Sequence, residues 1–260
     1  MYILITNDDG IYAPGITALR RCLEPIAKRV TVAAPDRERS ASGHGITVHR
    51  PLRATEVFYK KETTKGWMVD GTPADCVKLA LDALLDEEPD LVISGINFGP
   101  NLGTDVLYSG TVSASLEALI NGVPSLAVSL ATSKMPDFEI AGDFVQKIVP
   151  IIVKEVLPEK TLLNINVPSG NPRGVRVSRL CNRRYVNVFH KRTDPRGKDY
   201  FWTAGEPLNL DQDDPETDAR AINEGYISVT PVHFDLTDYG LLEKLRDWPF
   251  PLQNHGELDI

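Results

Sequence analysis

The chain has 260 residues, of which 42% are hydrophobic and 25% are charged, and its formal net charge is -8. This composition provides enough apolar material for a packed core and excludes a disordered or collagen-like chain. The acidic excess opposes binding to nucleic acid or to an anionic membrane surface, so a phosphate-bearing ligand would need a local positive feature.

The three cysteines, Cys22, Cys76 and Cys181, are far apart and odd in number, and they lack the paired spacing of a zinc site. They indicate neither a disulfide framework nor zinc, and they fit a reducing compartment, the cytoplasm. Residues 1–6 lack the basic start of a signal peptide, and no segment reaches the roughly 18 uninterrupted apolar residues of a membrane span. We therefore expect neither export nor a membrane span.

Strands and helices are expected to alternate from the first residues onward. Residues 2–6 form a continuous apolar run typical of a buried strand, and after Gly15 apolar residues recur at helical spacing. Residues 30–34 predict the next strand, which Pro35 ends because proline removes a backbone donor. A strand, a helix and a strand in succession imply a parallel sheet.

The alternation continues to about residue 170. Thr72 is a helix N-cap, with proline at the first helical position and Asp75 at the third. The later pattern predicts strands at 90–94, 125–130 and 162–167, and helices at 111–121 and 140–156, the second of which Pro150 should kink or interrupt. The predicted fold class is α/β, a Rossmann-like, doubly wound and mainly parallel sheet.

The alternation of strands and helices stops after residue 174. Short β-like runs, a basic and aromatic stretch at 183–185, a turn at 194–197 and an acidic loop at 211–216 indicate a protruding β arm. Residues 236–245 favour a last helix and 249–260 a frayed tail. We therefore divide the chain into a core, 1–174, and a segment, 175–260, that carries the arm and packs on the core. Its exposed aromatic residues favour an oligomerisation role.

Three loops that follow predicted strands are unusually polar, at 7–10, 37–44 and 95–101. Ligands bind outside the carboxyl ends of strands in such sheets, and neighbouring strands would bring these loops together. The adjacent carboxylates of Asp8 and Asp9 repel each other unless a cation lies between them, and oxygen ligands favour Mg²⁺ or Mn²⁺. An ordinary acidic turn is the alternative. Ser40 and Asn97 could add neutral oxygen ligands or could simply cap their loops.

The third loop leads to Ser109, Gly110 and Thr111, where a helix begins. Small residues at a helix N-terminus let free N–H groups and hydroxyls face an anion, which predicts a phosphate cradle. A plain Ser or Thr N-cap would give the same pattern. Neither a nucleoside triphosphate loop nor a dinucleotide glycine motif occurs, so a monophosphate ligand stays open.

Other chemistry-bearing residues are weaker candidates. His44, His49 and His233 could act as acid or base, but a histidine without a visible partner is more often structural. The basic and aromatic residues of the arm resemble a small nucleic-acid patch, although a solvated arm explains them better. Stacking of a nucleotide base on them is a further alternative. These residues are Arg183, Arg184, Tyr185, Phe189, Lys191 and Arg192.

Several long motifs, taken in order, resemble the survival protein SurE family over nearly the whole chain. They are TNDDG at 6–10, APDRERSASG at 34–43, GTPADCV at 71–77, SGINFGPN at 94–101, YSGTV at 108–112 and YISVTPVHFDLT at 226–237. The resemblance implies a metal-dependent 5'- and 3'-nucleotidase, with some members acting on short polyphosphate. It also implies a Rossmann-like core and C-terminal elements exchanged within a homodimer or homotetramer.

The resemblance also assigns residues. Asp8, Asp9, Ser40 and Asn97 match the ligands of one divalent metal cation per subunit, Mg²⁺ or Mn²⁺, while Asn101, Ser109, Gly110 and Thr111 match residues around the phosphate. Asp8 and Asp9 are also the catalytic candidates. Aspartyl-phosphate phosphatases are the mechanistic rival but use Asp-x-Asp. A nucleotide-binding oxidoreductase or sensor is opposed by the missing glycine motif, and a nucleic-acid-binding protein by the acidic charge.

Overall fold

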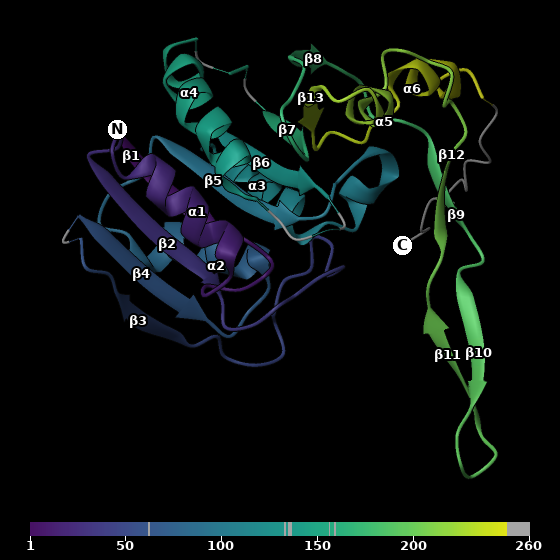
Figure 1. Cartoon of the computed structure of the whole chain (residues 1–260), viewed down its shortest axis with the longest axis horizontal. Coiled ribbons are helices and arrows are strands. Elements are labelled where there is room, and N and C mark those ends of the chain that lie inside the picture. The colour runs from purple at the N-terminus through teal and green to yellow at the C-terminus, as the bar shows by residue number, and fades with distance from the viewer. Residues whose placement is uncertain (62, 133, 135–136, 156, 159, 249–260) are drawn as a thin grey trace, which may run out of the picture.

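The computed structural model describes residues 1–61, 63–132, 134, 137–155, 157–158 and 160–248 (Figure 1). Within these residues a nine-stranded sheet runs in the order β3-β4-β2-β1-β5-β6-β7-β13-β8. Its strands are β1 Tyr2–Thr6, β2 Arg29–Pro35, β3 Ala54–Phe58, β4 Thr64–Val69, β5 Leu91–Phe98, β6 Ser125–Ala131, β7 Thr161–Pro168, β8 Val175–Val177 and β13 Ile227–His233.

The strands from β4 to β7 pair in parallel, while β3 and β13 add antiparallel pairs at the two sides. β1 lies between β2 and β5, so the chain leaves β1 toward one side of the sheet and later returns to its other side. The loop after β1 is therefore at the switch point of the sheet, where ligands bind in this class of fold.

Helices cover both faces of the sheet (Figure 1). α1 Pro14–Leu23 and α4 Glu139–Glu155 pack on one face, and α2 Pro73–Leu79 and α3 Gly110–Ile120 on the other. Side chains of a strand alternate between faces, so Ile3 and Ile5 of β1 join the core under α1 and α4, while Leu4 joins the core under α2 and α3. The central strands are thus buried on both faces, which explains their continuous apolar sequences.

The helix predicted to start after Thr72 has the expected capping box. The Thr72 hydroxyl accepts from the Asp75 backbone N–H at 3.1 Å, and the Asp75 carboxylate accepts from the Thr72 N–H at 2.8 Å. The helix continues as a π-helix over Ala80–Leu84. These reciprocal bonds satisfy two helix-start donors that would otherwise lack partners.

Some predicted boundaries were wrong. Pro150 does not interrupt α4, which runs to Glu155 with Pro150 on its exposed side and Val149 and Ile152 buried. β3 and β4 are absent from the predicted elements because β3 is largely exposed and has no continuous apolar run. The predicted C-terminal helix begins later than expected, as α6 Tyr239–Leu245, and the predicted tail at 249–260 lies outside the described residues.

Beyond β8, a two-stranded arm leaves the sheet (Figure 1). β9 Arg183–Val186 pairs with β12 Glu206–Asn209, and β10 Phe189–Thr193 pairs with β11 Asp199–Thr203, all antiparallel. The chain then returns through α5 Asp218–Asn223 to β13. We call residues 183–209 the β arm; β8 and β13, which also follow residue 174, belong to the central sheet.

Candidate functional site

The loop after β1 and the start of α3 meet at the carboxyl edge of the sheet. Asp8 is only 5% exposed, and its Oδ1 accepts a hydrogen bond of 2.6 Å from the Thr111 hydroxyl. Gly110 packs directly on the same aspartate, since a Cβ at position 110 would lie 2.8 Å from Asp8 Cβ. The structure therefore brings together residues 103 positions apart that the sequence assigned to metal and phosphate.

The loops after β2 and β5 border Asp8 and Asp9. The backbone N–H of Arg39 donates to the Asp8 carbonyl at 2.7 Å, which places the exposed Ser40 beside this loop. The Phe98 N–H points to Asp9 Oδ2 at 3.4 Å. Asn97 directly precedes Phe98, so it belongs to the segment that contacts Asp9. The four predicted metal ligands therefore lie on three adjoining segments: the loop after β1, the loop after β2, and the end of β5, which includes Asn97.

Ser40 and Asn97 also make the local bonds expected of loop residues. The Ser40 hydroxyl donates to Glu38 Oε1 at 2.6 Å, and the Asn97 amide nitrogen donates to the Gly99 carbonyl at 2.8 Å. In Asn97 this bond uses the nitrogen and leaves the amide oxygen as the possible ligand atom. Loop capping and a ligand role are therefore compatible at this position.

The two aspartates are electrostatically unfavourable neighbours. Burial raises the pKa of Asp8, against the opposing effect of its hydrogen bonds with Thr111. Burial, and then the charge of Asp8, raise the pKa of Asp9 to about 6. Both sites thus disfavour the ionised carboxylate, and a cation held between the two aspartates would remove this penalty.

The donor set fits a hard divalent ion. Among the described residues, no group of three or more His, Cys, Asp or Glu side chains gathers in a way that could hold a metal. The candidate site instead offers two carboxylates with the neutral oxygens of Ser40 and Asn97. A set made only of oxygen suits Mg²⁺ or Mn²⁺, whereas zinc and copper favour nitrogen or sulfur ligands.

Ser109 is the N-cap of α3, as one of the two sequence interpretations required. Its hydroxyl accepts from the Val112 N–H at 3.1 Å, and its carbonyl accepts from the Ser113 hydroxyl at 2.6 Å. The N–H groups of the first helical turn have no partner within the helix, and the helix dipole favours an anion there. The capping role of Ser109 is therefore compatible with the predicted phosphate cradle at Gly110 and Thr111.

Asn101 is held in a buried network that the sequence did not predict. It is 7% exposed, its side-chain nitrogen donates to the Ser129 hydroxyl at 2.8 Å, and its N–H donates to Asn166 Oδ1 at 2.8 Å. Its carbonyl accepts from Asn164 and Asn166. The signal was present, since two asparagines alternate in an apolar strand where one face must satisfy them. Asn101 therefore braces the loop that leads to Ser109.

The same loop is also fastened to the root of the β arm. Arg183 donates to Asp105 Oδ2 at 2.8 Å, and the Tyr185 hydroxyl donates to Asp105 Oδ1 at 3.0 Å. The Asp105 carbonyl accepts from the Ser109 N–H at 3.0 Å. One residue thus contacts both the arm and the start of α3.

The three histidines have different surroundings. His44 Nε2 lies 2.8 Å from Glu117 Oε2, so the partner that the sequence did not reveal is a carboxylate of α3. Like His44, His49 and His233 are exposed. Only His44 is therefore tied to an element of the candidate site among these histidines.

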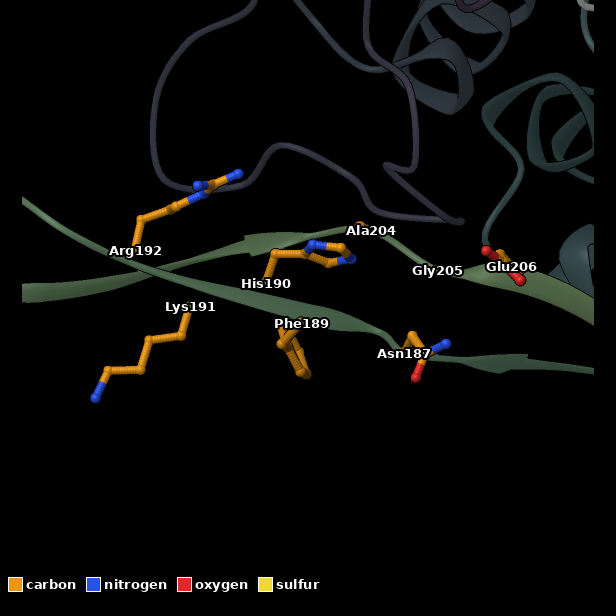
Figure 2. Close-up of a pocket in the computed structure, with 8 residues that line it drawn as sticks. All are labelled: Asn187, Phe189, His190, Lys191, Arg192, Ala204, Gly205 and Glu206. Carbon is orange, nitrogen blue, oxygen red and sulfur yellow. The ribbon is translucent and has the colours of Figure 1, made fainter.

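A hollow of about 570 Å³ lies on the β arm and not at the candidate site (Figure 2). Phe189 and Lys191 extend from one side of β10, and His190 and Arg192 from the other, as a strand requires. The basic and aromatic residues noted in the sequence are therefore spread over two faces of the arm.

The fold and this geometry define a doubly wound α/β protein with an oxygen-lined candidate site at the switch point of its sheet. A family model described as "Survival protein SurE" matches residues 3–187. The chain therefore belongs to the SurE family, and the resemblance inferred from its motifs is confirmed.

Two curated relatives named 5'-nucleotidase SurE align with nearly the whole chain. The protein of Pelotomaculum thermopropionicum is 62% identical over 246 residues, which cover 95% of this chain and 94% of the relative. The protein of Desulforamulus reducens is 61% identical over 249 residues, covering 95% and 98%. A crystal structure of SurE protein from Aquifex aeolicus, 40% identical, covers 95% of this chain and 98% of its own with a TM-score of 0.82. The predicted fold class is thereby confirmed.

Among the described residues, no helix combines the length and the apolar character that crossing a lipid bilayer demands.

Proposed function

We propose that the chain is a 5'-nucleotidase, a phosphohydrolase that releases phosphate from nucleoside monophosphates. The observation that carries the proposal is the contact of buried Asp8 with Gly110 and Thr111, which sets paired carboxylates against a helix N-terminus. Both curated relatives described above bear the name of this activity. Family resemblance extends the proposed substrates to nucleoside 3'-monophosphates and short polyphosphate.

Four residues would hold one divalent cation per subunit, Mg²⁺ or Mn²⁺: Asp8, Asp9, Ser40 and Asn97. When bound, such an ion supplies Lewis acidity and neutralises negative charge at the phosphoryl group. The raised pKa values of both aspartates support this assignment, because two ionised carboxylates at this spacing need a compensating positive charge.

The protein's own groups position the phosphate. The N–H groups at the start of α3, with the Ser109 hydroxyl, would donate to its oxygens, while the Thr111 hydroxyl donates to Asp8 beside them. Gly110 lacks a side chain that would otherwise occupy the space beside Asp8. Asn101 holds the preceding loop in place and offers the rest of its amide to the phosphate. Asp8 and Asp9 are the proposed catalytic groups, which accept the proton of the attacking water.

The test of this function is phosphate release from purified protein. With Mn²⁺ or Mg²⁺, AMP and other nucleoside monophosphates should yield nucleoside and phosphate, and exhaustive chelation should abolish the release until either metal returns. Full activity after chelation would overturn the metal assignment. A protein that binds nucleotide without releasing phosphate in any metal would instead be a sensor.

The β arm supports a homodimer or homotetramer. The proposed location of this assembly is the cytoplasm. Residues 183–209 contain six Lys or Arg and three Asp or Glu, whereas the whole chain has a net charge of -8. A basic arm therefore extends from an acidic body, and this difference in charge would favour contact between the arm and the body of a second copy. On this proposal the segment 175–260 supplies the oligomerisation elements and 1–174 the catalytic core.

A further inference from the structure

The loop between β2 and β3, residues 36–53, carries Ser40 and is fastened to α3. The Gly43 N–H donates to the Tyr108 carbonyl at 3.0 Å, next to the N-cap Ser109. One residue later, the His44 imidazole donates through Nε2 to Glu117 Oε2 at 2.8 Å. The loop therefore meets α3 both just before its first turn and further along its length.

The same loop is also fastened to α2. Thr47 donates through its N–H and its hydroxyl to the two oxygens of Asp75, at 2.8 and 2.6 Å. The Thr72 hydroxyl donates to the Gly45 carbonyl at 2.7 Å. These bonds begin after His44. Before it, the Arg39 guanidinium donates to the Asp70 carbonyl at 3.4 Å, and the His44–Glu117 bond ties this stretch to α3.

Glu117 is a buried charge with a specific set of partners. It is 5% exposed, and it accepts from His44, from Lys78 Nζ at 3.2 Å and from the Asn121 side chain at 3.1 Å. The hydrogen bond with His44 is the first cause that lowers the pKa of Glu117 to about 2. A buried carboxylate is tolerated only when it is paired in this way, so its position fixes the groups bound to it.

The stretch before His44 has few other restraints. Residues 37, 38, 40 and 41 are exposed, and both Ala41 and Gly43 have positive φ. The Arg39 N–H bond to the Asp8 carbonyl and the Gly43 bond to Tyr108 are its backbone links to the site. The side-chain link at His44 therefore adds to these bonds a restraint that ties the Ser40 stretch to α3.

We propose that His44 is a positioning residue for the candidate site: Glu117 holds its imidazole, and this pair fixes the Ser40 stretch against the N-terminus of α3. The inference rests on the proposed function, because Ser40 is a proposed metal ligand and α3 the proposed phosphate cradle. Ser40 lies on the loop after β2 and the phosphate cradle at the start of α3, and the His44–Glu117 pair sets the spacing between these two segments.

Lys78 provides a matched control. It binds the same carboxylate as His44 but comes from α2, so it makes no link to the Ser40 stretch. His44→Ala and Lys78→Met each remove one hydrogen bond from Glu117. A merely structural role would give both variants the same phenotype, whereas a positioning role separates them. His44→Gln keeps an amide nitrogen that can donate to Glu117 and serves as the conservative rescue.

The experiment compares the full chain and these three variants. His44→Ala should raise the KM for AMP and the Mn²⁺ concentration that half-saturates the thermal shift by about tenfold each, with a smaller fall in kcat. His44→Gln should recover both to within about threefold, and Lys78→Met should leave both within about twofold. Amide hydrogen exchange over residues 37–43 should accelerate in His44→Ala and not in Lys78→Met.

The outcomes are distinguishable. An unmodified chain that releases no phosphate from AMP would defeat the proposed function, and the exchange rates would still decide whether His44 restrains the loop. With an active chain, equal effects of His44→Ala and Lys78→Met, or unchanged KM and Mn²⁺ dependence in His44→Ala, would overturn the positioning role.

Discussion

The loops of the candidate site are held by bonds within the chain, whereas the β arm leaves its side chains in solvent. Asp8 is 5% exposed, while Phe189 and Trp202 of the arm are 66% and 65% exposed. Large apolar side chains gain stability only when they leave water. The contrast teaches that the chain orders its site through its own bonds, while the arm presents large apolar side chains that contact with a second copy, as proposed above, would remove from water.

The strongest test of the self-ordered site is Asp8→Asn, which keeps the side-chain shape and removes one of two adjacent charges. Phosphate release should fall by about a hundredfold or more, because every proposed role of the metal depends on its placement. The metal-free variant should melt no lower than the original, since burial raises the Asp8 pKa and its ionised form therefore opposes folding.

Calorimetry with and without Mn²⁺ completes this test. Mn²⁺ should raise the melting temperature of the original more than that of Asp8→Asn, because a ligand stabilises only the state that binds it. A variant that melts lower without metal but retains its activity per folded molecule would make Asp8 a turn residue.

A second test fills the space beside Asp8. Gly110→Ala would set a Cβ 2.8 Å from Asp8 Cβ and 3.1 Å from Pro73 Cγ. We expect a loss of about 2 kcal/mol in the free energy of unfolding, with phosphate release at least about tenfold lower. Gly142→Ala is the control, since a Cβ there meets Cys22 Cβ at an ordinary 3.4 Å. Urea denaturation should find that control unchanged or slightly stabilised, and equal losses in both variants would refute the close-packing account.

A third test uses pH to measure how much the ion-paired Glu117 carboxylate stabilises the fold. The folded-state pKa of Glu117 is about 2, below its usual 4.5, so its contribution to stability is present above about pH 4.5 and disappears as the pH falls toward 2. We expect the stability difference between the original and Glu117→Gln to shrink by about 2 kcal/mol between pH 7 and pH 3. Parallel stability profiles from urea titrations would contradict the ion-paired assignment.

The smallest expected effect concerns the arm. Trp202→Ser removes a large exposed apolar side chain, so it should weaken self-association by about tenfold and leave the melting of the dissociated chain unchanged. Sedimentation over a range of concentrations would measure this, with Thr203→Ser as a conservative control on the same strand. An original chain that stays monomeric and active at micromolar concentration would remove the contrast between the two regions.

The sequence predicted those parts of the fold that local periodicity encodes. The six inner strands except β4 have continuous apolar runs, and the capping box at Thr72 marked α2. β3 was not predicted from the sequence because an exposed edge strand has no such apolar run. Pro150 was expected to interrupt α4, but buried Val149 and Ile152 on either side keep the helix on the sheet. Tertiary packing here outweighs a local preference.

The candidate site was predictable only where its residues follow strands. The convergence of Asp8 with Thr111 follows from the rule that loops meet at the carboxyl edge of a parallel sheet. The His44–Glu117 pair joins residues 73 positions apart, and no local pattern links them. The bracing of Asn101 by Asn166 likewise depends on the register of β6 against β7, which composition does not reveal.

The candidate site and the β arm are not fully separate, because Asp105 contacts both. Its carboxylate grips the arm root through Arg183 and Tyr185, and its carbonyl holds the N–H of Ser109. Asp105 therefore connects the arm root directly to the start of α3. If a partner shifts the arm root on binding, Asp105 would transmit the shift to Ser109, and a phosphate bound there would change the affinity for the partner by the same coupling free energy.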